Sequence, residues 1–390
     1  MSRTANPISA TFLRGGTSKG IFLKRADLPD DPTHWEPIFQ GIMGSPDPTY
    51  RRQLNGMGGG VSSLSKVCVI GPPTATNSNV DIEYTFVQVG IDDGVLDFSG
   101  NCGNLSSMVG VFALDEGLCV PRAVDPASGL ATVRFLNTNT SKVIETTFPI
   151  SGSGTAILDR PEVEMAGVPG KASRIVLQFV NPGGARTGKL LPTGSPVDTL
   201  EVALEDGSPL KIPTSLVDAT NPTVFIAAEH LAPAFGLEEE GITPRFLAQP
   251  DAERTIERIR QAGAVRMGLD PSQKAQPKIA ILSRPNLQAS EAGVDIAIHA
   301  FSMGVMHKAV PMTVGLCLGV AAGVPGTLAS LIAIQSGASR GVTPSRGEMV
   351  KIRHPGGDVE VGAHFDANGE VLNAQVVRTG RRLMKGAVWW

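Results

Sequence analysis

Two glycine-centred stretches of similar sequence stand in the two halves of this chain: TFLRGGTSKGIFL at residues 11–23 and FVNPGGARTGKLL at residues 179–191. In both, an apolar run typical of a strand enters a glycine turn and another apolar run leaves it. A second pair follows, because KVCVI at 66–70 resembles KIAIL at 278–282, and an uncharged helix-like run comes after each. The pattern predicts two similar domains, each rich in strands and each with one central hydrophobic helix.

The domain limits are placed where the composition changes. We predict a first domain at 1–172 and a second at 173–380, with the segment rich in glycine and proline at 150–173 as the linker. The C-terminal segment 381–390 is expected to return to the first domain as a strand. Because ligand sites favour domain interfaces, we expect the active site in the cleft between the two domains.

Composition and charge exclude several classes of protein. The 390 residues include 34 Lys and Arg against 37 Asp and Glu, a net charge of −3, which lacks the basic excess of a nucleic-acid binder. Four cysteines without a CxxC pair do not make a disulfide scaffold. No signal-peptide core is visible near residue 1, which predicts a cytoplasmic protein. The six histidines show no metal-ligand spacing, so no metal is expected.

The uncharged run at 309–339 invites a test for a membrane span, which needs about 20 apolar residues. Two prolines and several glycines interrupt it. We therefore predict two buried core helices, and no membrane partner.

The first candidate site segment is the turn GGTSKG at 15–20. It matches G-x-S-x-G formally, but a nucleophile elbow needs a helix after the turn, and here an apolar strand follows. The turn instead offers open backbone N–H groups, which hold anions, beside the side chains of Thr17, Ser18 and Lys19. These three are candidate substrate-binding residues. The alternative is a plain hairpin turn.

The second candidate segment is GMGGGVSSLSK at 56–66, where Ser62, Ser63 and Ser65 precede Lys66. The serines suit a carboxylate ligand. Lys66 stands at the mouth of an apolar strand, where a charged amine is costly unless it is paired. Burial favours the uncharged amine, which can act as a general base. The alternative is an ordinary edge lysine that reaches solvent.

The third candidate segment is GNCGNLSS at 100–107, which leads into the helix-like apolar run at 105–114. A cysteine at a helix N-terminus has its thiolate stabilised by the helix dipole, so Cys102 is a candidate reactive group, flanked by the binding candidates Asn101, Gly103 and Asn104. The alternative is a buried inert thiol, which is our interpretation for the three other cysteines.

Taken together, ATFLRGGTSKGIFL, NGMGGGVSSLSK and DFSGNCGNLSSMVGVF resemble the PrpF family of isomerases. This family includes 2-methylaconitate, aconitate and methylitaconate isomerases and 4-oxalomesaconate tautomerase. The resemblance is strongest over residues 10–115 and extends weakly through NPGGARTG and FSMGVMHKA. It implies a diaminopimelate-epimerase-like α+β fold: two pseudo-symmetric domains, each a curved, mostly antiparallel sheet around a central hydrophobic helix.

The resemblance also implies catalytic residues. The family's lysine and cysteine correspond to Lys66 and Cys102. Epimerases of this fold use one cysteine from each half, but the second-half segment Ser302, Met303 and Gly304 contains none, which argues against a two-thiol racemase. These three residues are expected to close the pocket from the second domain.

The expected function is a cofactor-independent isomerase of unsaturated di- or tricarboxylates that moves an allylic proton. Aconitate or 2-methylaconitate is the expected substrate, with either cis–trans isomerisation or double-bond migration as the outcome. One alternative is a 4-oxalomesaconate tautomerase. Another is a non-catalytic accessory or ligand-binding protein for an aconitase-like hydratase, which would not need Lys66 and Cys102. A homodimer is the default expectation for an enzyme that assembles.

Overall fold

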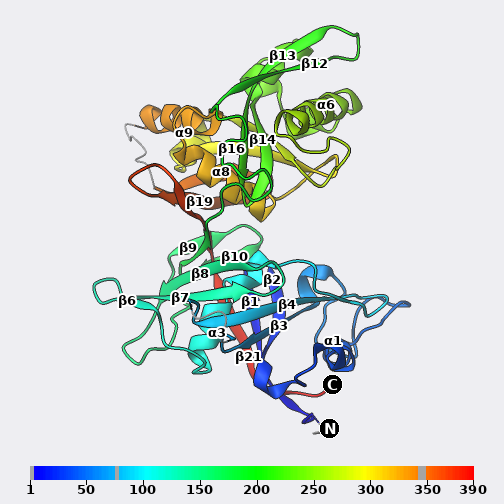
Figure 1. Ribbon diagram of the computed structural model, residues 1–390, viewed down its shortest axis with the longest axis vertical. Coiled ribbons are helices and arrows are strands. Elements are labelled where there is room, and N and C mark those ends of the chain that lie inside the picture. The colour runs from blue at the N-terminus through cyan, green and yellow to red at the C-terminus, as the bar shows by residue number, and fades with distance from the viewer. Residues whose placement is uncertain (1–3, 75–78, 341–347) are drawn as a thin grey trace. The chain divides into compact units, whose positions relative to one another are not determined.

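The computed structural model describes residues 4–74, 79–340 and 348–390 (Figure 1). The chain forms two units, one made by Met1–Gln178 with Val377–Trp390 and the other by Phe179–Val376. These limits differ by a few residues from the predicted divisions after 172 and 380. The reason is that the chain passes from one unit to the other within two strands, β11 (Ile175–Val180) and β20 (Val371–Arg378).

The first unit is built on one curved sheet. β1 pairs antiparallel with β2 and with the C-terminal strand β21, whereas the β2–β3 and β4–β7 pairs are parallel. In spatial order its strands are β21 (Gly380–Val388), β1 (Ile8–Gly15), β2 (Ser18–Lys24), β3 (Lys66–Gly71), β4 (Ile82–Val89), β7 (Leu130–Asn137) and β8 (Lys142–Pro149).

A buried helical segment lies against the inner face of this sheet. The apolar run at 105–114 forms two pieces, α2 (Gly103–Ser106) and α3 (Val109–Asp115), where one helix was expected. Phe112 of α3 packs on Phe22 of β2, with 5.6 Å between the ring centres. Gly110 allows the close approach, because a Cβ atom there would lie 2.2 Å from Thr146 Oγ1. This inner face carries the candidate site at one end.

The opposite face of the sheet is covered by α1 (Glu36–Met43). Its buried residues Ile38, Phe39, Ile42 and Met43 follow the spacing of an amphipathic helix. They pack on alternate residues of β2 and β3, including Ile21, Leu23, Val67 and Val69. Since side chains alternate along a strand, Ser18, Phe22 and Lys66 belong to the inner face.

The second unit repeats this topology. Its strands pair in the order β12 (Asp198–Ala203), β13 (Pro209–Ala219), β14 (Asn221–Ala227), β15 (Lys278–Ser283), β16 (Ile296–Ser302), β18 (Val350–His354), β19 (Gly357–Phe365) and β20. The parallel pairs are β14–β15 and β16–β18, in the same places as β2–β3 and β4–β7. The predicted fold class, two pseudo-symmetric α+β domains, is confirmed.

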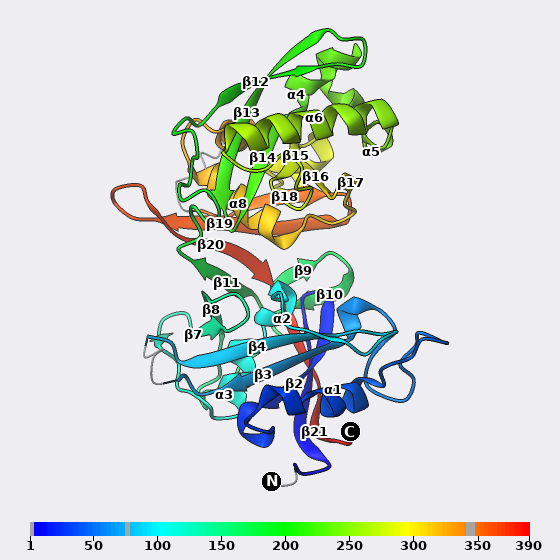
Figure 2. The same cartoon turned by 45° about the vertical axis from the view of Figure 1, so that its right-hand side comes forward.

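The central helix of the second unit is α8 (Met312–Gly323), which lies against β13, β14 and β19. Gly319 of α8 meets Gly362 of β19 so closely that a Cβ atom would lie 2.6 Å from the Gly362 nitrogen. Two further helices belong to this unit: α6 (Pro250–Arg266), labelled in Figure 2, and α9 (Leu328–Ser339), labelled in Figure 1. Shorter elements of the chain are β5 (Leu96–Asp97), β6 (Ala123–Asp125), β9 (Val163–Met165), β10 (Val168–Ala172), β17 (Val305–Met306), α4 (Ala228–Leu231), α5 (Pro244–Leu247) and α7 (Leu287–Glu291).

The internal repeat is real, but one of the two sequence alignments was wrong. KVCVI and KIAIL form β3 and β15, which hold equivalent places in the two sheets. The turn at 15–20 is the β1–β2 hairpin, whose counterpart is the β13–β14 hairpin at Thr220. The glycines at 183–188 lie instead in a loop after β11. Glycine turns look alike in sequence because they share only a backbone conformation.

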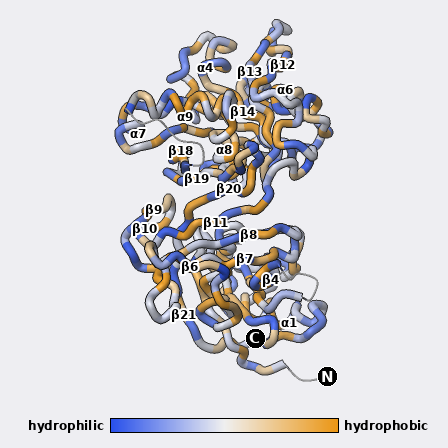
Figure 3. The backbone as a smooth tube through the Cα atoms, turned by 60° about the vertical axis from the view of Figure 1, so that its left-hand side comes forward, coloured by the Kyte–Doolittle hydropathy of each residue, from blue (hydrophilic) through white to orange (hydrophobic). Residues whose placement is uncertain are grey.

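The uncharged run at 309–339 forms α8 and α9, as predicted, and Figure 3 shows the hydrophobic residues along α8. No single helix among the described residues is long and apolar enough to cross a membrane, and α8 and α9 pass that test only as a pair bent by 71°. Residues 314–321 of α8 are buried. Leu331 and Ile334 of α9 are exposed, so α9 is not the fully buried helix that we expected.

The segment 150–173 is not an extended linker. It contains the β9–β10 hairpin and folds as part of the first unit. Ser173 is buried, and its hydroxyl accepts a hydrogen bond from the Arg160 backbone at 3.0 Å. Glycine and proline here mark tight turns rather than a free connection.

Candidate active site

Two predicted segments, GGTSKG and GNCGN, lie in contact at one end of the inner face of the first unit. A Cβ atom at Gly15 would lie 2.4 Å from the Asn104 carbonyl oxygen, and one at Gly16 would lie 2.3 Å from Asn104 Oδ1. Gly16 also has a φ of +53°, which favours glycine. The glycines of the β1–β2 turn therefore allow α2 to sit directly on it, and Asn104 Nδ2 donates to Thr17 Oγ1 at 3.1 Å.

Gly20 marks a second close approach, and its substitution gives a test of packing. A Cβ atom there would lie 2.7 Å from Leu105 Cδ1 and 2.9 Å from the Lys66 carbonyl oxygen. Because both neighbours are held in packed structure, we expect Gly20→Ala to lower the free energy of unfolding by about 1–3 kcal/mol. Urea denaturation measures this. Gly386→Ala is the matched control, because no atom lies within 4 Å of its added methyl group; equal stability of the two variants would contradict the prediction.

Lys66 begins β3 on the inner face, and its side chain is buried, with 9% of its surface exposed. Its Nζ donates a hydrogen bond of 2.5 Å to Gln88 Oε1 and lies 4.9 Å from the centre of the Phe86 ring. Among the described residues no carboxylate forms an ion pair with it. An amide oxygen and an aromatic ring, both of them neutral groups, hold the amine in place.

The orientation of Gln88 is set by the backbone around Lys66. Gln88 Nε2 donates to the carbonyl oxygens of Ser62 and Ser65, at 3.1 and 2.7 Å. The amide nitrogen is thereby directed at the loop, and Oε1 is left to face Lys66. Gln88 lies directly opposite Lys66 in the β3–β4 register. Gln88 was not among the predicted site residues, because nothing local in YTFVQVG distinguishes a positioning glutamine from a surface one.

The loop before Lys66 is organised by another glutamine, Gln53, which is buried. Gln53 Nε2 donates to Ser45 Oγ and Ser65 Oγ, at 2.8 and 2.7 Å, and Gln53 Oε1 accepts from the Gly60 backbone at 3.0 Å. The Ser65 hydroxyl also donates to the Val89 carbonyl oxygen at 2.9 Å. Ser65 is thus fully engaged within the protein, and its hydroxyl holds the loop.

Cys102 stands at the N-cap of α2, with its Sγ 3.8 Å from Ser18 Oγ. Because α2 has four residues and the helix breaks before α3, the dipole at Cys102 is smaller than the predicted longer helix would supply. Lys66 and Cys102 both act electrostatically on one neighbour, the buried thiol of Cys68. Burial first, and then Cys102, raises the pKa of Cys68 well above its usual value, while Lys66 lowers it.

Of the two remaining thiols, that of Cys317 is buried and that of Cys119 is partly buried. Burial raises the pKa of Cys119 to about 11 and that of Cys317 to about 12. Thiols with such pKa values stay protonated at neutral pH and are poor nucleophiles. The raised pKa values of Cys119 and Cys317 are therefore typical of inert packing residues.

Arg378, at the end of β20, is a site residue that sequence analysis missed. Its Nε donates to Asn104 Oδ1 at 3.1 Å and its Nη1 to the Val377 carbonyl oxygen at 2.9 Å. Burial lowers the pKa of Arg378 to about 10, an effect that nearby Cys102 opposes. Among the described residues no carboxylate pairs with this guanidinium and none accepts from Nη2. The pairing of distant strands, rather than any local motif, brings it to Asn104.

Of the other predicted substrate-binding residues, only some lie on the inner face near Lys66 and Cys102. Ser18 is buried on the inner face, whereas Lys19, the next residue, is on the opposite face. Ser62 is exposed and Ser63 is partly exposed, and both lie in a 3-10 turn before β3. Asn101 Oδ1 accepts a hydrogen bond from Ser106 Oγ at 3.1 Å. Gly103 is the first residue of α2.

The predicted contribution of the second unit concerns the turn between β16 and β17. Met303 is exposed, with a φ of +57°, and Gly304 has a φ of +80°. Ser302 ends β16. That these three residues close the pocket over Lys66 stays a prediction.

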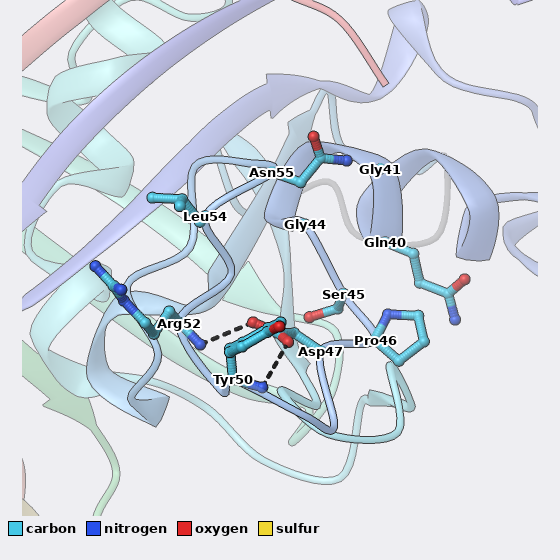
Figure 4. Close-up of a pocket in the computed structure, with 10 residues that line it drawn as sticks. All are labelled: Gln40, Gly41, Gly44, Ser45, Pro46, Asp47, Tyr50, Arg52, Leu54 and Asn55. Atoms are coloured by element: carbon cyan, nitrogen blue, oxygen red, sulfur yellow. Dashed lines mark hydrogen bonds between the residues drawn. The ribbon is translucent and has the colours of Figure 1, made fainter.

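A separate cavity of about 470 Å³ lies beside the C-terminus of α1 (Figure 4). Its one carboxylate, Asp47, accepts hydrogen bonds from the backbone nitrogens of Tyr50, Arg52 and Gln53. These bonds lower the pKa of Asp47, with the largest effect from Arg52. The carboxylate therefore organises the loop leading to Lys66, and the cavity offers no comparable group for catalysis.

Comparison with known proteins places this arrangement in a family. The PrpF protein family matches residues 5–390. The 2-methyl-aconitate isomerase of Shewanella oneidensis is 36% identical, covering 98% of this chain and 96% of that protein. The 3-methylitaconate isomerase of Eubacterium barkeri is 34% identical, covering 98% and 97%. A crystal structure of methylitaconate-delta-isomerase superposes with a TM-score of 0.82 at 34% identity, covering 99% and 96%.

The match spans nearly the whole chain and includes both units and all three candidate segments. The resemblance identified from the sequence is confirmed, and so is the prediction of an isomerase that acts on a small molecule. This chain belongs to the PrpF family and is an isomerase.

Proposed function

We propose that this isomerase acts on unsaturated tricarboxylates of the aconitate and 2-methylaconitate type, by moving an allylic proton. The observation that carries the proposal is the buried amine of Lys66, held by the amide of Gln88 at 2.5 Å with only neutral partners around it. The relatives named for 2-methylaconitate and methylitaconate support the substrate class. Both molecules carry a C–H bond next to a double bond that is conjugated with a carboxylate.

In the proposed reaction the uncharged Lys66 amine removes the allylic proton as a general base. The electron pair of the C–H bond is spread through the double bond onto a carboxylate, giving a dienolate. Rotation about the former double bond and return of the proton to the same carbon gives the cis–trans isomer; return to the far end of the allylic system moves the double bond. The protonated Lys66 can return the proton itself, which restores the amine. If the thiol of Cys102 returns it instead, the protonated Lys66 then gives its proton to the Cys102 thiolate, so atoms and charge balance without an external reactant.

Charge that develops on the substrate carboxylate needs preorganised donors. The Arg378 guanidinium, through Nη2, is our candidate for this task, because it lies against Asn104 and has no carboxylate of its own among the described residues. Thr17, Ser18 and the open backbone of the β1–β2 turn are candidates for the remaining carboxylates.

The proposal is tested by a proton NMR assay in deuterated water with purified protein and a panel of cis-aconitate, trans-aconitate, 2-methylaconitate, methylitaconate and 4-oxalomesaconate. We expect isomerisation of an aconitate-type acid with deuterium incorporated at the allylic carbon. Turnover of 4-oxalomesaconate alone, or isomerisation with no exchange at any carbon, would contradict the proposal.

Substitution of Arg378 tests its role as a carboxylate ligand. Loss of one charged hydrogen bond is worth about 1.5–3 kcal/mol, so we expect Arg378→Gln to lower kcat/KM by roughly 10- to 100-fold. Arg378→Lys should recover part of the loss, since it restores charge but not the planar donor pair. Steady-state kinetics with the preferred substrate measures this. A variant with unchanged KM and kcat would show that Arg378 has only a structural role.

A further inference from the structure

Three cations stand side by side on the outer face of the first unit, away from Lys66. In the strand register Arg14 of β1 is directly opposite Lys19 of β2 on one side and directly opposite Arg381 of β21 on the other. Residues directly opposite each other in an antiparallel pair point to the same face, and like charges placed so are destabilising. This row of cations is therefore a cost to the folded protein unless an anion offsets it.

The row forms one wall of a cavity of about 740 Å³ that lies wholly within the first unit. The β9–β10 hairpin, labelled in Figures 1 and 2, also lines the cavity. It adds a fourth cation, Lys171. Two carboxylates lie in the cavity wall or contact a residue of it. Asp159 is an exposed lining residue, and Asp115 forms an ion pair with Arg382, a further lining residue. With both carboxylates counted, the residues that line the cavity still carry a net positive charge.

The contacts of these cations do not neutralise them. Arg14 Nη1 donates to the carbonyl oxygens of Gly16 and Thr379 and to Thr379 Oγ1, all of them neutral. Lys19 Nζ lies 5.6 Å from the centre of the Phe12 ring. Burial and the charge of Arg381 lower the pKa of Arg14. Within the described ranges none of the four cations forms an ion pair with a carboxylate.

We propose that this cavity is a second anion site, distinct from the Lys66 site, that binds a small polyanion of the phosphate or polycarboxylate type. Four cations on four separate elements surround the space, so a ligand with two or more negative charges can contact several at once. Arginine suits the planar oxygens of carboxylate and phosphate groups, and lysine adds point charge. The chain as a whole has a net charge of −3, so the positive cavity is a local feature rather than part of a general basic surface.

Isothermal titration calorimetry of the full chain with inorganic pyrophosphate, and separately with citrate, tests the site and distinguishes the two sources. We expect saturable binding of at least one probe, weakened roughly 10- to 100-fold by Arg381→Gln and by Lys171→Gln, since each removes a charged contact. Lys385→Gln is the matched control for Arg381→Gln. It also removes one positive charge from β21, but Lys385 does not line the cavity. This control should bind as the unaltered protein does.

The Lys66→Met variant separates the two sites, because citrate resembles the proposed substrates. Binding that persists in Lys66→Met and is lost in Arg381→Gln locates the anion in the cavity. The proposal is overturned if neither probe binds, if Arg381→Gln and Lys171→Gln bind as the unaltered protein does, or if binding is lost in Lys66→Met and kept in Arg381→Gln.

Discussion

Replacing Lys66 with methionine is expected to lower kcat by about 10²–10⁴-fold or more, the range that a general acid or base contributes. Methionine has a similar length and is tolerated in the apolar surroundings of Phe86 and β3. The variant loses the Lys66 amine while the backbone of β3 is retained. Proton NMR of substrate turnover in deuterated water measures both isomerisation and exchange at the allylic carbon.

The control for this variant is Lys24→Met, which removes a partly exposed lysine from the end of the adjacent strand β2. Circular dichroism should show that both variants fold. Leaving Gln88 Oε1 without its partner costs about 1–3 kcal/mol, so a modest loss of stability in Lys66→Met is expected. Exchange at a rate within tenfold of the unaltered protein would eliminate Lys66 as the base.

Replacing Gln88 with glutamate should displace the pH dependence of the reaction toward alkaline pH. The substitution places a carboxylate where the amide oxygen lies 2.5 Å from Lys66 Nζ. An opposite charge at this distance favours the charged amine, by the equivalent of about 1–3 pH units. A base must be uncharged to accept a proton, so the acidic limb of the kcat/KM profile should move up by that amount. At neutral pH we expect a loss of roughly 10- to 1000-fold that recovers as the pH rises.

A matched variant separates charge from geometry. Gln88→Met also loses the two hydrogen bonds from Gln88 Nε2 to the Ser62 and Ser65 carbonyl oxygens, but it adds no charge. We expect it to lower activity without an alkaline displacement. If the two variants give the same pH profile, the neutrality of the partner of Lys66 has no part in catalysis.

Much of the candidate site was predictable because its segments have strong local signatures. Lys66 precedes five residues of a buried strand, which made it a candidate but left open whether its side chain is buried or reaches solvent; the structure shows that it is buried. The glycines of GGTSKG predicted a turn of special geometry, and the structure shows that Gly16 and Gly20 leave room for Asn104 and Leu105. Local pattern did less well where a helix ends: the break between α2 and α3 falls inside an apolar run.

Two residues of the candidate site were beyond local pattern. Gln88 reaches Lys66 through the register of β3 and β4, and Arg378 reaches Asn104 from the far end of the chain. The face presented by Lys19 also depends on pairing, because a shift of one residue in register would exchange the inner and outer faces. The same pairing places Lys19 beside Arg14 and Arg381.

By itself, the sequence determined the two-fold α+β organisation and the three glycine-rich segments, because strand periodicity and turn chemistry are properties of neighbouring residues. It also singled out Lys66 and Cys102 as the candidate amine and thiol. Only the tertiary structure decided that Lys66 has an amide partner, that Arg378 joins the site, and that a row of cations forms on the opposite face. These depend on contacts between residues far apart in the chain, which are set by strand register and helix packing, and no short stretch of sequence encodes them.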